Sequence, residues 1–304
     1  MRFFFIGVFI CCTKLLTAQS VTTDSTCDGW WVRQGRDTVL FFQVRPQSIN
    51  GKYERAPFIH PLYDAKGRIL TENGPADHPY HRGIFWAWHQ VRKEDAWVAD
   101  GWVSENLLYE FISTRATVKK GKAVLKSTIH WIHPEKGKLV EEKATLVVHS
   151  KGKLYRQLDI FLHVRPLQSE VAIGGSDDHK GYGGFCMRWI NPTMLRFSQQ
   201  EKQILPTEAF LTNLPWMQFD IMPDQNSLST ILVLADNGRQ TNSDKWVLRN
   251  SLSMQNNMFP GPVAINLPDE GLLLTYRLLI FNKPVKGLQG EKYYHQFLQE
   301  NKLK

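Results

Sequence analysis

Short apolar or alternating runs, broken by Gly, Pro, Asn and Asp, dominate the chain from Asp37 onward. Runs of this kind separated by turn residues are typical of β-strands. The clearest stretch extends from Leu107 to Val164, where Lys-Gly turns at 120–122, 135–138 and 151–153 separate four strand-like segments. Strands joined by short turns pair with their neighbours, so this stretch predicts an antiparallel meander.

The last of these segments shows the alternation most clearly. Apolar residues Leu158, Ile160, Leu162 and Val164 alternate there with Gln157, Asp159, Phe161 and His163. Because successive side chains of a strand point to opposite faces, we expect one face of this strand to pack and the other, mainly polar face to lie toward solvent.

The remainder of the chain continues the same pattern. We expect further strands at Gly183–Trp189, Trp216–Met222, Thr230–Ala235 and Leu272–Phe281, and a helix only at Glu291–Asn301. No low-complexity linker or obvious repeat divides the sequence. The pattern therefore predicts an all-β fold, a large antiparallel β-sandwich that forms a single domain over residues 20–304 and ends in a short C-terminal helix.

The first residues have a different character. A basic Arg2 is followed by an apolar run over residues 3–12 and by small and polar residues up to Ser20, which predicts a signal peptide at residues 1–19. The apolar run is shorter than the roughly 20 residues that a helix needs to cross a bilayer. We therefore expect a periplasmic or secreted protein without stable membrane insertion.

Charge and cysteine content narrow the function classes. The formal net charge of the 304-residue chain is +8, but much of the excess lies in the Lys-rich turns, apart from interleaved aromatic residues. This distribution argues against nucleic acid as a partner. Once the leader is removed, Cys27 and Cys186 remain, and they are either a single disulfide bond or two free thiols.

The first candidate site is a window rich in histidine, proline and aromatic residues. It contains His60, Asp77, His78, His81, Arg82 and His89. A loop between two strand-like runs suits a binding site. Asp77, His78 and His81 could share a divalent metal, although Pro79 argues against a helical zinc motif. In the alternative interpretation, these histidines bond to backbone carbonyls and pack under Trp86 and Trp88.

A second window, residues 174–188, combines glycines with acidic and basic groups. A carboxylate beside an imidazole could move protons at neutral pH, so Asp178 and His179 are candidate catalytic residues. Lys180, Tyr182 and Arg188 could hold anionic or hydroxyl groups of a ligand. Neither a P-loop nor a dinucleotide fingerprint is complete, so we expect no nucleotide cofactor. The alternative is a solvated hairpin.

The two windows together give a set of predicted roles. His81, His179 and Asp178 are the predicted catalytic residues, and the predicted ligand is a small molecule or an oligosaccharide. Predicted substrate-binding residues are His60, Arg82, Trp88, His89, Lys180, Tyr182 and Arg188. Exposed indole rings could also stack on sugar faces, and the candidates beside the first window are Trp86, Trp88 and Trp97.

Residues 58–88, FIHPLYDAKGRILTENGPADHPYHRGIFWAW, resemble a bacterial family labelled methane oxygenase PmoA and also described as a secreted domain of unknown function. Segments 180–188 and 274–278 are similar to it as well. The resemblance implies a β-rich build similar to the galactose-mutarotase supersandwich and an occurrence in sugar-utilising bacteria. The mutarotase pattern has a catalytic Glu near the C-terminus, to which no residue of this chain clearly aligns. The label itself implies a metal-dependent oxygenase.

Three functional hypotheses follow. In the first, the protein is an exported carbohydrate-active enzyme, a lyase, hydrolase or epimerase, whose two histidine windows meet in one cleft. In the second, the same loops hold a carbohydrate without transforming it. The third is the metal-dependent oxygenase of the family label, but a subunit of the membrane-bound enzyme would need a long apolar run, and none follows the leader.

Overall fold

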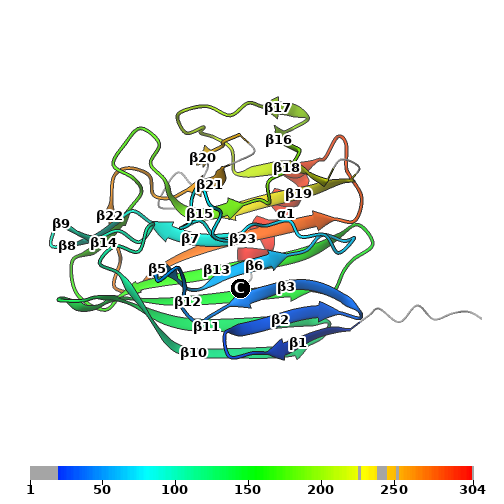
Figure 1. The fold of residues 1–304 in the computed structure, drawn as a ribbon. Helices are drawn as coiled ribbons and strands as arrows, with labels where there is room; N and C mark the ends of the chain where they lie inside the picture. Colours follow the sequence, from blue (N-terminus) through cyan, green and yellow to red (C-terminus); the bar gives the residue numbers. More distant parts are fainter. Residues whose placement is uncertain (1–19, 225–226, 238–244, 251–252, 303–304) are drawn as a thin grey trace, which may run out of the picture.

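The computed structural model describes residues 20–224, 227–237, 245–250 and 253–302. In this part of the chain every strand pairing is antiparallel, and two large sheets lie face to face, with β1–β3 of one in front of β10–β13 of the other (Figure 1). The eight-stranded sheet contains, in order, β1 (Val21–Ser25), β2 (Gly29–Gln34), β3 (Asp37–Gln43), β6 (Phe58–Leu62), β7 (Ile84–Trp88), β15 (Gly183–Arg188), β21 (Met254–Met258) and β20 (Lys245–Val247).

The second large sheet has nine strands. They are, in order, β10 (Leu108–Lys119), β11 (Lys122–His133), β12 (Gly137–His149), β13 (Tyr155–Pro166), β23 (Leu272–Phe281), β19 (Ser227–Asp236), β18 (Trp216–Asp224), β16 (Met194–Gln199) and β17 (Lys202–Ile204). A smaller sheet contains β22 (Ile265–Asn266), β14 (Val171–Gly174), β8 (Gln90–Lys93) and β9 (Ala96–Ala99), and β4 (Gln47–Ile49) pairs with β5 (Lys52–Arg55). The predicted all-β sandwich is confirmed.

The predicted meander is confirmed as β10–β13, which pair in sequence order through the Lys-Gly turns. The alternation of β13 also holds for the apolar side, because Leu158, Ile160, Leu162 and Val164 are all buried. The polar side differs at Asp159, which is only 2% exposed. Its carboxylate is buried because Arg277 Nε donates to Oδ1 at 2.6 Å and His149 Nε2 lies 3.0 Å from Oδ2.

The main core lies between the two large sheets. Rings from opposite sheets meet there: Trp88 of β7 lies 5.6 Å from Trp131 of β11, and Phe185 of β15 stacks on Tyr276 of β23 at 4.2 Å between ring centroids. The buried residues of this core extend along the chain from Val21 to Ile280. This core contains residues from both large sheets. The single-domain organisation stays a prediction.

The predicted C-terminal helix is confirmed as α1 (Gly290–Lys302), one residue longer at each end than expected. Phe297 is fully buried against a second apolar cluster that includes Trp216, Leu232 and Phe281. The ion pair between Arg277 Nη2 and Glu300 Oε2, at 2.8 Å, holds the end of the helix to β23. The helix therefore covers the face of the nine-stranded sheet that points away from the main core.

The first residue of α1 leaves no room for a side chain. A Cβ atom on Gly290 would lie 2.4–2.6 Å from the ring of Trp216. We expect Gly290→Ala to lower the free energy of unfolding by about 1–3 kcal/mol, because forcing atoms into a packed site strains its neighbours. Urea denaturation measures the change. Gly152→Ala is the matched control, since a Cβ there meets only the carbonyl oxygen of Tyr155, at 3.2 Å. Equal midpoints for the two variants would contradict the prediction.

Three expectations concern the termini and the cysteines. The predicted signal peptide, residues 1–19, lies outside the described residues. No helix in the described ranges has both the length and the apolar character needed to cross a bilayer. Cys27 is exposed and Cys186 is buried, and both are free thiols.

Candidate functional site

A small pocket lies on the outer face of the eight-stranded sheet. Along β7, Ile84, Trp86 and Trp88 belong to the main core, whereas the intervening Phe85 and Ala87 belong to a separate cluster on the other face. Phe58 of β6, Cys186 of β15, Met254 of β21 and Trp102 are the other buried members of this cluster. A cavity of about 150 Å³ lies beside it, lined by His78, Tyr80, His81, His89, Trp102, Val103, Tyr182, Ser253 and Met254.

The pairing of β7 with β15 brings the two sequence windows together. In this antiparallel pair Ile84 lies opposite Met187, and Trp88 lies opposite Gly183. The histidine loop before β7 therefore lies next to the end of β15, where Arg188 is, and the residues after β7 lie next to Tyr182. Two segments about 100 residues apart in sequence contribute to one pocket as a result.

Asp77 and His78 form the first acid–imidazole pair. His78 Nδ1 lies 2.8 Å from Asp77 Oδ2. Arg188 Nη2 donates to both oxygens of Asp77, at 2.9 and 3.0 Å, and Arg188 Nε donates to Glu72 at 3.0 Å. Burial raises the pKa of Asp77, but the hydrogen bonds from His78 and Arg188 outweigh it and hold that pKa below its usual value. Asp77 is thus an ionised acceptor that fixes His78 through Nδ1.

His89 and Asp100 form a second pair of the same kind. His89 Nδ1 lies 2.9 Å from Asp100 Oδ2, and the His89 ring stacks on Trp102 with centroids 4.9 Å apart. Asp100 Oδ1 accepts a hydrogen bond from the backbone N–H of Trp102 at 2.7 Å. Arg55 holds this turn from below, because its Nη2 donates to the carbonyls of Gly101 and Trp102 at 2.7 Å. In both pairs Nε2 remains the ring nitrogen available to a ligand.

His81 lies between these pairs and behaves differently. Its side chain is only 4% exposed, and its ring is parallel to that of His78, with centroids 4.7 Å apart. Within the described residues its Nδ1 has no hydrogen-bond partner. Burial, with a smaller effect of His78 and Arg188, lowers the pKa of His81 to about 2. The ring is therefore neutral at physiological pH, and it can exchange hydrogen bonds with a ligand but cannot readily accept a proton.

The structure divides the predicted residues of the second window between the pocket and a neighbouring loop. Asp178 Oδ1 accepts hydrogen bonds from its own loop, namely from Ser176 Oγ and the backbone N–H groups of Lys180 and Gly181. His179 is exposed beside it. Of the predicted residues in the second window, Tyr182 lines the cavity and Arg188 reaches it through Asp77.

Three predicted substrate-binding residues of the first window have structural contacts instead. Trp88 is fully buried in the main core, where its indole N–H donates to the carbonyl of Phe259 at 2.9 Å. Arg82 Nη2 donates to the carbonyls of Tyr53 and Gln47. His60 Nδ1 lies 3.0 Å from the hydroxyl of Thr71, and burial, assisted by Arg82, lowers the pKa of His60 to about 4.

Residues 30–295 match a family of unknown function, DUF6807. The chain belongs to this family. No curated protein matches the chain.

A metal role in this DUF6807 chain was predicted for Asp77, His78 and His81. Asp77 already accepts hydrogen bonds from Arg188 and His78. The rings of His78 and His81 stack in parallel, so their nitrogen lone pairs lie in two separate planes and do not converge on one point. Across the described ranges there is no group of three or more His, Cys, Asp or Glu side chains arranged to hold a metal ion. Proton transfer and hydrogen bonding are the chemistry that this arrangement supports.

Sequence reasoning missed Asp100, Trp102 and Arg249. Arg249 Nε donates to the Tyr182 hydroxyl at 2.6 Å and so fixes a pocket residue from outside. Asp100 and Trp102 lie in a turn directly after the short strand β9. The sequence does contain a signal for this turn, namely an acidic residue at the end of a strand followed by Gly and Trp. That Asp100 pairs with His89, however, follows only from the folded structure.

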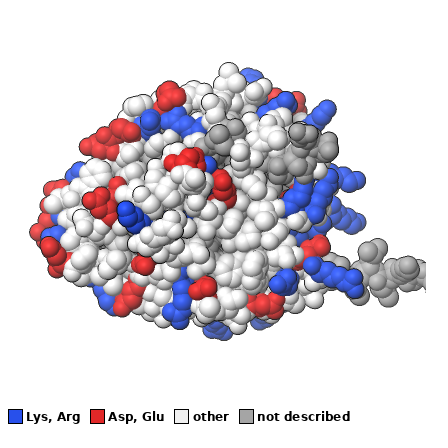
Figure 2. All heavy atoms as spheres, viewed as in Figure 1, with Lys and Arg blue, Asp and Glu red and all other residues white. Residues whose placement is uncertain are grey.

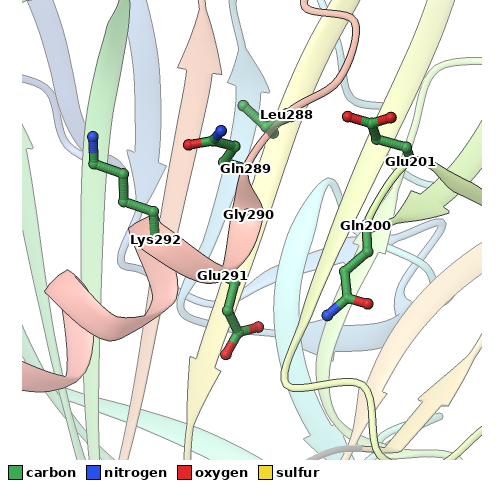
Figure 3. Close-up of a pocket in the computed structure, with 7 residues that line it drawn as sticks. All are labelled: Gln200, Glu201, Leu288, Gln289, Gly290, Glu291 and Lys292. Atoms are coloured by element: carbon green, nitrogen blue, oxygen red, sulfur yellow. The ribbon is translucent and has the colours of Figure 1, made fainter.

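A different cavity, of about 410 Å³, lies between the β16–β17 turn and the start of α1. Figure 3 shows that Lys292 and Glu291 point in opposite directions from the start of the helix. The lining consists of Gln200, Glu201 and residues 288–292 and contains no aromatic ring or imidazole. The histidine pocket is therefore the better candidate for chemistry.

Proposed function

We propose that this protein is an exported carbohydrate-active enzyme, a lyase, hydrolase or epimerase that transfers protons on a sugar or modified glycoside. The observation that carries the proposal is that two imidazoles, each oriented by its own carboxylate, line one pocket together with aromatic rings. Paired His and Asp residues are a recurrent device for acid–base catalysis.

The chemistry follows from the two pairs. A carboxylate that accepts from Nδ1–H leaves a lone pair on Nε2, so His78 or His89 can act as a base, and the carboxylate then stabilises the imidazolium. In a lyase reaction, one ring removes a proton from carbon, the electron pair left behind forms the C=C bond as a C–O bond breaks, and the other ring protonates the departing oxygen. In an epimerase, the second ring returns a proton to the opposite face of the same carbon.

Two features favour a sugar as the ligand. Trp102, Tyr80 and Tyr182 give the pocket aromatic surfaces on which the CH groups of a sugar ring can pack. The cavity of about 150 Å³ lies below the roughly 300–1,000 Å³ of common ligand pockets, which favours a single sugar unit. The proposal includes a build similar to the galactose-mutarotase supersandwich, which supports sugar binding by analogy of fold alone.

The proposal also includes export, because residues 1–19 have the composition of a signal peptide. The oxygenase activity implied by the PmoA label remains a separate prediction. Elemental analysis of protein incubated with copper or iron checks it, with one bound equivalent as the supporting outcome.

The direct test is turnover by the mature protein on a panel of glycosides and keto-sugars, with products resolved by chromatography. We expect His89→Ala to lower the rate by at least about 100-fold, because a positioned acid or base contributes roughly 10²–10⁴. His163→Ala is the control, since His163 lies on β13 and does not line the pocket. Full activity of His89→Ala would reject its role.

The second candidate function is carbohydrate binding without catalysis. The neutral, buried His81 and the Tyr182 hydroxyl held by Arg249 are suited to fixed hydrogen bonds with a ligand. Calorimetry on the same panel separates the two functions. Micromolar binding without any product favours the binding protein over the enzyme.

A further inference from the structure

We propose that a second saccharide subsite lies next to the histidine pocket, at the exposed ring of Trp97, so that the ligand contains at least two sugar units. This inference rests on the proposed function for the nature of the ligand, but it concerns a different cavity. The subsite cavity has a volume of about 310 Å³ and is lined by Trp97, Val98, Ala99, Asp100, Glu105 and Asn106.

Asp100 connects the two cavities. Its Oδ2 oxygen holds His89, which lines the histidine pocket, while Asp100 itself lines the subsite cavity. The following residues, Gly101 and Trp102, are fixed by Arg55, so the wall between the cavities is rigid. A ligand bound to the histidine pocket can therefore extend past this turn to Trp97.

Trp97 has the properties of a stacking platform. Its side chain is 45% exposed, whereas Trp86, Trp88 and Trp102 in the same region are buried. The indole N–H donates to the carbonyl of Ala99 at 2.9 Å, which fixes the ring before any ligand binds. An exposed aromatic face is stabilised when a partner covers it and removes it from water. A sugar ring is such a partner, because its CH groups pack on the electron-rich face of the indole.

Polar side chains beside the indole suit the hydroxyl groups of that sugar. Glu105 and Asn106 are exposed at the cavity, and their loop is fixed because Asp100 and Glu105 exchange backbone hydrogen bonds of 2.9 Å in both directions. A carboxylate accepts hydrogen bonds from hydroxyl groups, and an amide both donates and accepts them.

The charge of the lining selects among sugars. Two carboxylates, Asp100 and Glu105, line the cavity, and no Lys or Arg is among its lining residues. Figure 2 shows acidic side chains, with basic ones among them, at the left end of the molecule, where Figure 1 places β8 and β9. Like charges repel, so the subsite takes a neutral or amino sugar in preference to a uronic acid.

An array of neutral, amino and uronic-acid mono- and disaccharides, followed by calorimetry on the glycans that bind, tests the inference with the mature chain. We expect Trp97→Ala to weaken binding of a neutral disaccharide by roughly tenfold and to leave binding of its monosaccharide within about twofold. Trp31→Ala is the matched control, because Trp31 lies on β2, is partly exposed and lines neither cavity.

The outcomes are distinguishable from those of the catalytic test. Equal loss for the mono- and disaccharide, no loss for either, or failure of every glycan on the array to bind would overturn the subsite. A selective loss of disaccharide binding supports it. If that loss occurs while no product forms in any reaction, the subsite stands and the enzymatic function fails.

Discussion

On the proposed acid–base mechanism, replacing His78 by Ala is expected to lower kcat/KM by about 10²- to 10⁴-fold. The imidazole of His78 is held in place by two successive contacts: Asp77 orients the ring, and Arg188 binds both oxygens of Asp77. Removal of the ring abolishes proton transfer at Nε2 but leaves the apolar floor of the pocket in place. Initial rates at several substrate concentrations separate the effect on kcat from that on KM.

Asp77→Asn provides a graded comparison for this experiment. The amide can hold the ring but cannot stabilise an imidazolium, so we expect kcat to fall while KM changes little. His163→Gln serves as a further control, because His163 Nε2 lies 2.9 Å from the carbonyl oxygen of Glu270 and the residue does not line the pocket. If His78→Ala retains wild-type kcat/KM, the acid–base assignment of this pair is wrong.

Asp159→Ala is expected to reduce the free energy of unfolding by about 3–5 kcal/mol, the usual cost of removing one partner of a buried ion pair. The substitution removes the carboxylate that Arg277 contacts at 2.6 Å and leaves this buried guanidinium with the partly exposed Glu300 as its ion-pair partner. It also removes one hydrogen-bond partner of His149. Urea denaturation followed by circular dichroism measures the loss.

The same residue predicts how stability depends on pH. Burial raises the pKa of Asp159, but hydrogen bonds from His149 and Arg277 outweigh it and lower the pKa from 3.8 to about 2. A lowered carboxyl pKa stabilises the fold above the unfolded-state value, and this contribution is lost as pH falls from about 4 toward 2. The Asp159→Ala variant should therefore lack the loss of stability that the wild-type protein shows as pH falls from about 4 toward 2. The exposed Glu94, which pairs with Lys93, provides the control, and Glu94→Gln should cause no measurable change. Equal urea midpoints for Asp159→Ala and Glu94→Gln would contradict the expectation.

Local sequence signals predicted the meander and the helix because each depends on neighbours along the chain. The strand β21, Met254–Met258, shows where such signals fail. Its central residues Gln255, Asn256 and Asn257 are polar, yet all three are fully buried. Asn256 Nδ2 donates to the carbonyls of Gly183 and Phe185 on β15, so its burial depends on a strand about 70 residues away. No periodicity in the sequence records that partner.

The candidate site likewise contains some residues that the sequence predicted and others that only the fold reveals. The high density of histidines in the sequence predicted the loop before β7 as part of a site. Which residues of the second window lie next to that loop is determined by the pairing of β7 with β15. Asp178 was predicted to be catalytic from its position beside His179. In the structure its Oδ1 oxygen accepts hydrogen bonds from the backbone N–H groups two and three residues further along the chain, those of Lys180 and Gly181. That local turn is a common alternative for Asp, and the sequence alone could not decide between the two. Asp100 was missed because its imidazole partner is 11 residues away and across a turn.

The division of β7 and β15 into two sets of side chains has a consequence for protein engineering. Ile84, Trp86 and Trp88 pack in the main core between the sheets, whereas Phe85 and Ala87 pack in the separate buried cluster beside the pocket. Substitutions restricted to Phe85 and Ala87 are therefore expected to change the packing beside the pocket and to leave the contact between the two sheets in place. The two faces of one strand thus offer separate positions for altering the surroundings of the pocket and for preserving the sandwich.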